Sequence, residues 1–320
     1  MEDVKFTFLL PAYKARFFQL ALESIKNQSY SNFKCIVSDD CSPENLKNIF
    51  DSVCAEDHRF TYRRNFKNLG SENLVSHWNL LLNKCSSPYF IMASDDDIFH
   101  VEFLETLNAL TEKYPDVSMI RSRTQKIDST GKMLQLEGEY QEYNDGIDFY
   151  KQFFCSDYIP CIANILFKTN LLKEMGGFID FPLAIGSDDA TTLSLSKYGV
   201  VNTKDILFSF RVSGINLSDF RNTDPKILAK KMKAINLFSE WISKDFANIM
   251  ERNFDTNKIK DIKYGIFSYL HACMTGVAYQ LNYLKFLNQI AYMYKKHLIA
   301  KNENFLKLNW RWFKINYLSK

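Results

Sequence analysis

The stretch "YFIMASDDDIFHVEF", residues 89–103, runs from an apolar segment into three consecutive aspartates and back into apolar residues. Adjacent carboxylates repel one another unless a cation or a set of hydrogen-bond donors holds them. An N-cap for a helix in "HVEFLETLNALTEKY" would explain one of the three, because a cap needs a single side chain. Three exceed that need, so we favour a site for a divalent metal or a diphosphate at Asp95, Asp96 and Asp97.

Short β-rich runs alternate with helical patterns before and around this stretch. The strand-like runs are "KFTFLLP", "FKCIVSDD", "RFTYRR" and "YFIMASDDD", and the helical ones are "ARFFQLALESIKNQ", "PENLKNIFDSVCAED" and "SENLVSHWNLLLNKCS". This alternation predicts βαβ units and a parallel sheet, whose ligands bind at the carboxyl ends of the strands. We therefore expect Asp39 and Asp40, which also follow a strand, to lie on the same edge of the sheet as the three aspartates.

The pattern becomes mixed between residues 115 and 215. It predicts a hairpin over "DVSMIRSRTQKI" and "GKMLQLE", strands over "CIANILFK" and "DILFSFRV", and helices near residues 146–154 and 188–199. Long helical segments follow Pro225. The sequence thus predicts an α/β domain over residues 1–222 and an α-helical C-terminal region over residues 223–320.

The composition is that of a globular protein, with 46% hydrophobic and 24% charged residues among 320. A formal net charge of +3 is too small to indicate a nucleic-acid partner, and none is expected. Seven cysteines without a CxxC pair indicate reduced thiols rather than a disulfide framework or a zinc site.

The cellular location is predicted from two segments. The start "MEDVKFTFLLP" lacks the basic region and the cleavage site of a secretory signal, so cytoplasmic residence is expected. Residues 264–284 contain no charged side chain apart from histidine, but their polar residues favour a buried helix over a membrane span. The tail "FLKLNWRWFKINYLSK" interleaves aromatic with basic residues, which suits either contact with an anionic membrane surface or packing against the preceding helices.

Further candidate residues lie near the ends of other predicted elements. Tyr13 in "LLPAYK" could stack on a planar ligand or belong to the core, and Asn68 and Gly70 form a turn before a helix N-terminus, which favours anions. Arg211 could clamp a phosphate or pair with a carboxylate. The chain has no P-loop and no GxGxxG motif.

A last acidic pair, Asp188 and Asp189, begins the helix predicted near residues 188–199. Helix capping would explain the pair, but adjacent carboxylates can also raise one pKa enough for a catalytic base.

In this order, the motifs resemble those of the family 2 glycosyltransferases, which have the GT-A fold. The matching segments are "LLPAYKARFFQLALESIKNQSY", "IVSDDCS", "NLG", "HWNLLL", "IMASDDD" and "SDDATTLSLSKYG", within residues 4–218. The chain departs from the family pattern at Ser94, Cys41 and Ser187, where Asp, Gly and Glu are usual.

The resemblance implies a role for each matching residue. Asp96, assisted by Asp95 or Asp97, would hold a Mn²⁺ or Mg²⁺ ion on the diphosphate of a nucleotide sugar. The remaining residues of the implied nucleotide-sugar site are Pro11, Ala12, Tyr13, Asp40, Asn68, Gly70 and Arg211, with Asp40 accepting from the base. The catalytic base would be Asp188 or Asp189; we favour Asp188, because its register needs no gap.

The implied reaction is an inverting, metal-dependent transfer of a sugar, with a UDP-sugar as the expected donor. The acceptor would be a hydroxyl of a glycan or a lipid-linked molecule in bacterial surface polysaccharide biosynthesis, at the inner face of the membrane if the tail binds there. Two alternatives stay open: a sugar nucleotidyltransferase, and a non-catalytic protein that binds nucleotide sugars.

Overall fold

The structure is a computed structural model that describes residues 4–214, 224–299 and 303–318. It divides into two compact units, one of residues 1–180 with 187–215 and one of residues 181–186 with 216–320. The change of pattern expected at residue 222 falls within residues 215–223, outside the described residues.

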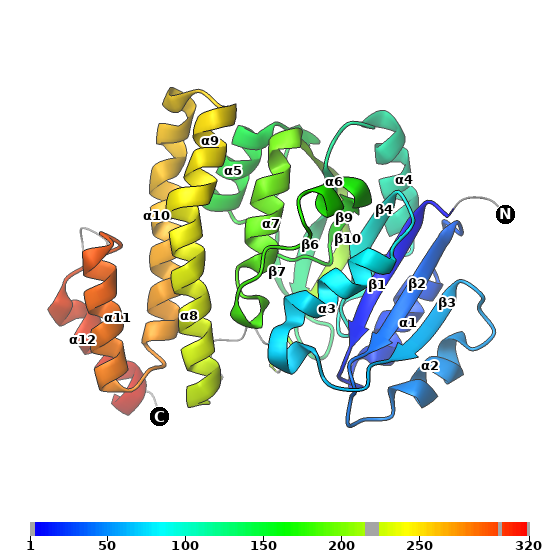
Figure 1. Cartoon of the computed structure of the whole chain (residues 1–320), viewed down its shortest axis with the longest axis horizontal. Coiled ribbons are helices and arrows are strands. Elements are labelled where there is room, and N and C mark those ends of the chain that lie inside the picture. The colour runs from blue at the N-terminus through cyan, green and yellow to red at the C-terminus, as the bar shows by residue number, and fades with distance from the viewer. Residues whose placement is uncertain (1–3, 215–223, 300–302, 319–320) are drawn as a thin grey trace. The chain divides into compact units, whose positions relative to one another are not determined.

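The described residues of the first unit form a ten-stranded sheet (Figure 1). The strand order is β3-β2-β1-β4-β9-β6-β10-β5, with β7 pairing with β6 and β8 with β10. The strands are β1 Phe6–Ala12, β2 Phe33–Asp39, β3 Phe60–Arg64, β4 Tyr89–Met92, β5 Ile98–Phe99, β6 Met119–Ile127, β7 Met133–Leu136, β8 Tyr143–Asn144, β9 Ile165–Lys168 and β10 Val200–Arg211.

Most strands of this sheet run in one direction. β1 pairs in parallel with β2 and β4, and β2 pairs in parallel with β3. β9 is antiparallel to both β4 and β6, so β6 and its parallel partner β10 run in the direction of β1. The carboxyl ends of β1, β2, β4, β6 and β10 therefore lie at one edge, as the βαβ pattern predicts for the first four strands.

Helices cover both faces of the sheet (Figure 1). On one face, β1 to β3 share a core with α1, α2 and α4, in which Phe8 and Phe103 are fully buried. On the other face, Trp78 of α3 packs edge-on against Phe178, and Phe90 of β4 stacks on Phe167 of β9. The helices of this unit are α1 Phe18–Lys26, α2 Leu46–Cys54, α3 Gly70–Lys84, α4 Phe103–Lys113, α5 Gly146–Cys155, α6 Thr169–Glu174, α7 Ser187–Leu195 and the short η2 Ser196–Tyr198.

Several local predictions can be compared with these elements. The hairpin is confirmed, because β6 and β7 pair in antiparallel fashion. The second helix begins later than the position of Pro43 suggests, because Asn45 caps α2 by accepting from the backbone of Asn48. The short strands β5 and β8 were not predicted, because two residues each are too few for an alternating pattern.

The second unit is helical. α8, the π-helical turn η3 and α9 follow one another directly, and α10 lies beside α8 (Figure 1). Four of its helices begin with a side-chain cap: Asp224, Asp255, Asn282 and Asn304 accept backbone N–H groups at the starts of α8, α10, α11 and α12. The elements are η1 Pro182–Ala184, α8 Pro225–Trp241, η3 Ile242–Phe246, α9 Ala247–Asn253, α10 Thr256–Ala278, α11 Tyr283–Lys295, α12 Phe305–Phe313 and η4 Lys314–Leu318.

Within the part of the chain that the structure describes, no helix combines the length and the apolar character that crossing a membrane requires. The segment 264–284 forms most of α10 and the turn after it, with Leu270 and Met274 buried and Tyr264 exposed.

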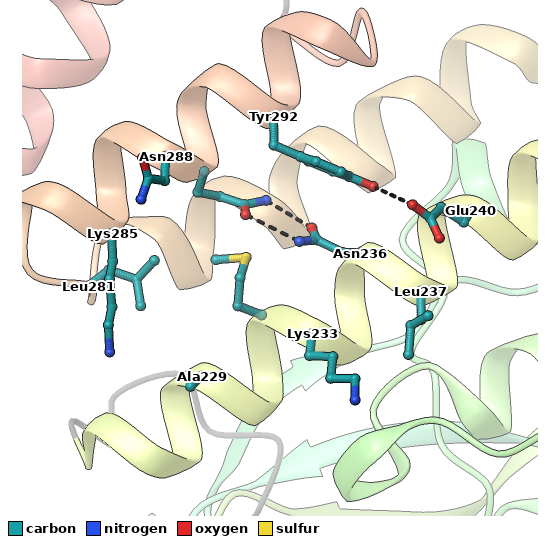
Figure 2. A pocket seen from close by; sticks show the side chains of 11 residues that line it. Ala229, Lys233, Asn236, Leu237, Glu240, Leu281, Lys285, Asn288 and Tyr292 are labelled. Atoms are coloured by element: carbon teal, nitrogen blue, oxygen red, sulfur yellow. Dashed lines mark hydrogen bonds between the residues drawn. The ribbon is translucent and has the colours of Figure 1, made fainter.

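A groove of about 560 Å³ lies between α8 and α11 (Figure 2). Two side-chain amides join its walls: Asn236 Nδ2 donates to Gln289 Oε1 at 3.3 Å, and Gln289 Nε2 donates to Asn236 Oδ1 at 2.9 Å. Tyr292 also donates to Glu240 across the groove at 3.3 Å. Because Gln289 is only 5% exposed, its amide depends on this partner rather than on water.

The amide pair gives a prediction for stability. Asn236→Leu strands the buried amide of Gln289 and should lower the free energy of unfolding by about 1–3 kcal/mol. Combining it with Gln289→Leu should cost less than the sum of the two single changes, because the double variant leaves no unsatisfied partner. Urea unfolding followed by tryptophan fluorescence measures this cycle. Asn288→Leu, an exposed change in the same groove, is the control; additive costs would contradict the coupling.

Candidate active site

The acidic loop, residues 94–97, follows β4 directly and is buried. Asp95 and Asp96 are each 6% exposed, and Asp97 is 1% exposed. None of them caps a helix: β5 comes next, and α4 begins only at Phe103, without a side-chain cap. The capping explanation for this cluster is therefore wrong, and the donors that hold it include backbone groups at the ends of other strands.

Asp95 is bound to the end of β1. Its Oδ2 atom accepts the backbone N–H groups of Tyr13 and Lys14, both at 2.8 Å. Burial raises the pKa of Asp95, and the neighbouring Asp96 raises it further, while Lys14 opposes the shift. This carboxylate thus ties the residues after β1 to the acidic loop.

Asp97 is bound to the end of β10. Its Oδ1 atom accepts the backbone N–H of Arg211 at 2.8 Å, and its Oδ2 atom accepts the hydroxyl of Ser94. Burial, followed by the charge of Asp96, raises the pKa of Asp97 to about 8. Both oxygens of this carboxylate are therefore already engaged within the protein.

Asp96 lies between these two and faces a cation. Lys14 Nζ is 3.2 Å from Asp96 Oδ2 and 3.8 Å from Asp95 Oδ1, and Ser213 Oγ is 3.4 Å from Asp96 Oδ2. Burial by itself would lower the pKa of Lys14, but the charges of Asp95 and Asp96 outweigh it and raise that pKa. The carboxylates of Asp95 and Asp96 thus bind a positively charged group within the protein itself.

A divalent ion needs fewer protein ligands when a diphosphate supplies most of its coordination. Within residues 4–214, 224–299 and 303–318, no cluster of three or more His, Cys, Asp or Glu side chains could hold a metal ion. A dedicated cage of protein ligands is thus not found there. Mg²⁺, however, is commonly bound through one or two carboxylates together with substrate phosphates, and Asp96 fits that arrangement.

Arg211 holds the backbone of the acidic loop through hydrogen bonds to carbonyl groups. Its Nε atom donates to the backbone carbonyl of Asp96 at 2.9 Å, and its Nη1 atom donates to that of Asp128 at 3.1 Å. The guanidinium also stacks on Phe17, 4.4 Å from the ring centre, and the residue is 4% exposed. These contacts fix the backbone that carries Asp96.

Asp40, after β2, holds the turn that starts α3. Its two carboxylate oxygens accept the backbone N–H groups of Leu69 at 2.9 Å and Gly70 at 2.7 Å, and Asn65 Nδ2 donates at 2.8 Å. A Cβ atom added at Gly70 would lie 3.0 Å from Asp40 Oδ2, so glycine permits this close approach. Asn68, half-buried, belongs to the same turn.

The residues at the end of β1 lie beside the end of β2, the strand that leads to Asp40, and they include an exposed aromatic ring. Ala12 is paired with Asp39 and its carbonyl accepts the backbone N–H of Asp40 at 2.8 Å. Pro11 is half-buried, whereas Tyr13 is 40% exposed. Ser42 donates its hydroxyl to the carbonyl of Tyr13 at 2.6 Å, which fixes the backbone that carries the exposed ring.

A Ser–His–Asp arrangement lies beneath the surface at Asp40. Ser38 Oγ is 2.9 Å from His77 Nε2, and His77 Nδ1 is 3.7 Å from Asp40 Oδ1. Ser38 and His77 have no exposed surface, and burial lowers the pKa of the imidazole. Because no substrate can reach the hydroxyl, this arrangement supports the strand end and is not a nucleophilic triad.

Asp188 and Asp189 begin α7, as the sequence predicts. Burial raises the pKa of Asp188 to about 6, although backbone N–H groups at the helix start oppose the shift. The thiol of Cys161 links this residue to the acidic loop: burial raises the pKa of Cys161, and the charges of Asp97 and Asp188 raise it further. The charges of Asp97 and Asp188 thus both act on the thiol of Cys161.

Three residues of this constellation were not identified from the sequence. Lys14 follows Tyr13 directly, and its position in a strand-end loop was the only signal available. Cys161 and Ser213 carry no signal, because their place beside the carboxylates depends on the order of β9, β6 and β10 in the sheet.

Comparison with known proteins gives a family and a fold. A sequence model of the family described as Glycosyl transferase family 2 matches residues 7–176, more than half of the chain. A protein of Rickettsia bellii (strain RML369-C) described as "Uncharacterized glycosyltransferase" is 31% identical over 138 residues, covering 42% of this chain and 19% of that protein. One of Haemophilus influenzae (strain ATCC 51907 / DSM 11121 / KW20 / Rd) with the same description is 24% identical over 236 residues, covering 71% of each.

The chain is shorter than some of these relatives. It spans about a fifth of the R. bellii protein and about a third of a Rickettsia felis relative.

Two solved structures share the fold. S. aureus TarS 1-349 in complex with UDP-GlcNAc superposes with a TM-score of 0.55 at 14% identity, over 92% of both chains. The mannosyltransferase PcManGT from Pyrobaculum calidifontis, in complex with GDP-Man and Mn²⁺, superposes with a TM-score of 0.54 at 15% identity, over 97% of this chain and 79% of that one.

Proposed function

Because the chain belongs to glycosyl transferase family 2 and has the GT-A fold, we propose that it transfers a sugar from a nucleotide-diphosphate donor to an acceptor hydroxyl. The proposed donor is a UDP-sugar, and the proposed acceptor is a glycan or lipid-linked molecule in surface polysaccharide biosynthesis. The nucleotide sugars bound in the TarS and PcManGT structures support a donor of this class.

One observation carries this proposal: at the carboxyl edge of the sheet the buried Asp96 lies 3.2 Å from the ammonium of Lys14, and the charges of Asp97 and Asp188 both act on the thiol of Cys161. The loop presents Asp96 beside a cation, and Asp188 has its pKa raised to about 6. A group that binds diphosphate and a group that accepts a proton are the two parts that glycosyl transfer requires.

The donor would be bound by residues after β1, β2 and β4. In this proposal Tyr13 stacks on the nucleobase, with Pro11, Ala12, Asp40, Asn68 and Gly70 shaping its pocket. A Mn²⁺ or Mg²⁺ ion held by Asp96 would neutralise charge on the departing diphosphate. Asp97 was expected as a second ligand; since both its oxygens are engaged, we assign it with Asp95 and Arg211 to holding the loop.

The transfer would proceed with inversion at the anomeric carbon. The carboxylate of Asp188 takes the proton of the acceptor hydroxyl, and the acceptor oxygen bonds to the anomeric carbon. The bond from that carbon to the diphosphate oxygen breaks at the same time, and the nucleotide diphosphate leaves with the electron pair. A β-linkage would result from an α-linked donor.

The role of Asp96 is tested by Asp96→Ala. We expect the variant to lose Mn²⁺-dependent binding of UDP and to keep its fold, because the side chain sits at the sheet edge rather than in the apolar core. Calorimetry with UDP, with and without Mn²⁺, measures the binding, and circular dichroism checks the fold. Unchanged Mn²⁺-dependent affinity in the variant would exclude Asp96 as the ligand.

The role of Asp188 is tested by Asp188→Asn, with Asp189→Asn as the matched control. The first change should keep UDP binding and lower turnover by at least about a hundredfold, the scale expected for a general base. In the unmodified protein kcat/KM should fall as the pH drops below about 6, because the base must be deprotonated. Release of UDP from UDP-sugars measures turnover. If only Asp189→Asn were inactive, the base would be Asp189.

The tail of the second unit supports a contact with the membrane surface. Four exposed side chains follow helical spacing: Leu306, Trp310, Phe313 and Tyr317. The ring of Phe313 stacks with those of Trp310 and Tyr317. Lys307, Arg311 and Lys314 are exposed among them. The opposite face is packed, since Trp312 is buried and donates to the carbonyl of Leu281 at 2.8 Å. Aromatic rings beside basic side chains suit an anionic bilayer surface, which would place the protein at the inner face of the membrane.

Substitution on the exposed face tests this contact without removing the packed Trp312. Trp310→Ser with Phe313→Ser should reduce cosedimentation with phosphatidylserine-containing vesicles by about tenfold or more, since each buried ring contributes about 1.5–3 kcal/mol. Tyr264→Ser, which removes an exposed ring from α10, should leave cosedimentation unchanged. Equal sedimentation of all three proteins would reject the contact.

A further inference from the structure

Lys14 places its ammonium beside the carboxylates of the acidic loop. Its ammonium lies 3.2 Å from Asp96 Oδ2 and 3.8 Å from Asp95 Oδ1. Its side chain is 29% exposed, whereas those of the two aspartates are 8% exposed. The ion pair is thus half-buried, where charges are screened less than at the surface.

The neighbouring cation is committed to other partners. Arg211 contacts the same loop, but its Nε and Nη1 atoms donate to the backbone carbonyls of Asp96 and Asp128, and its face stacks on Phe17. Lys14 pairs with both Asp95 and Asp96. It therefore offsets part of the charge that three adjacent aspartates bring to one loop.

Lys14 is anchored by its backbone and carries its charge on a flexible side chain. The backbone N–H donates to Asp95 Oδ2 at 2.8 Å, so the residue stays in place as long as the loop does. The ammonium is carried on a flexible four-carbon chain, and it presents three donors without the fixed geometry of a guanidinium. The charged group can thus change partner without any movement of the backbone.

We propose that Lys14 is a resident counter-ion of Asp95 and Asp96, which competes with a divalent ion in the donor-free protein and pairs with the diphosphate when the donor binds. The second half of this inference rests on the proposed function; the first half rests on the ion pairs alone. A merely structural lysine would stabilise the loop in every state, and its removal would weaken both kinds of binding or neither.

Lys14→Gln tests both halves, because they predict opposite changes. Loss of the competing ammonium should tighten the binding of Mn²⁺ alone by about tenfold, the scale of one charge-assisted contact. Loss of the positive charge should weaken the binding of UDP or GDP at saturating Mn²⁺ by about tenfold or more. Electron paramagnetic resonance of free Mn²⁺ measures the first change, and calorimetry measures the second.

Arg16→Gln is the matched control, because Arg16 is an exposed cation two residues further along that stacks on Phe17 and pairs with neither aspartate. It should change neither affinity, and thermal melting should show that both variants are folded. Unchanged or weaker Mn²⁺ binding in Lys14→Gln overturns the counter-ion role, and unchanged nucleotide binding overturns the transfer to the diphosphate. If Mn²⁺ binding tightens but the unmodified protein binds neither nucleotide, the counter-ion role of Lys14 stands. The proposed nucleotide-sugar donor then fails, and with it the pairing of Lys14 with the diphosphate.

Discussion

The repulsion among three adjacent carboxylates is the constraint on which the carboxyl edge of this sheet depends. Asp95 is held by the backbone that leaves β1, Asp97 by the backbone that ends β10, and Asp96 faces Lys14. β1 and β10 are not neighbours, since β4, β9 and β6 lie between them. The loop that concentrates negative charge is thus also the connection that joins the ends of distant strands, and removing Asp95 or Asp97 from it would alter more than a ligand site.

At the end of β2, too, acidic side chains accept hydrogen bonds from the protein itself. Asp39 has no exposed surface; it accepts the hydroxyl of Tyr62 and the backbone N–H of Ser42. Its neighbour Asp40 accepts the backbone N–H groups of Leu69 and Gly70. Each carboxylate therefore first satisfies backbone donors that would be costly to bury unpaired. The shape of the proposed nucleobase pocket follows from these bonds, because they set the turn before α3.

Part of the sheet and part of the candidate site could be predicted from the sequence. Alternating strands and helices predicted the parallel part of the sheet, because periodicity is a local property, and strand ends placed Asp40 and Asp95 to Asp97 on one edge. The use made of each aspartate was not predictable, because the donors from Lys14 and Arg211 come from strands whose order the sequence does not state. The starts of α2, after the cap at Asn45, and of α4, at Phe103, also differ from the sequence prediction.

Two carboxyl groups of the first unit, those of Asp97 and Asp188, show that burial alone does not decide a role. Burial is the main cause that raises the pKa of both Asp97, to about 8, and Asp188, to about 6. At Asp97 the charge of Asp96 adds to the shift, while Ser94 and the backbone N–H of Arg211 oppose it; at Asp188 backbone N–H groups at a helix start oppose the shift. A carboxyl group with a pKa of about 6 is ionised near neutral pH and is still basic enough to accept a proton. Both oxygens of Asp97 are instead engaged by Ser94 and the backbone of Arg211, which is why the proposed chemistry is assigned to Asp188.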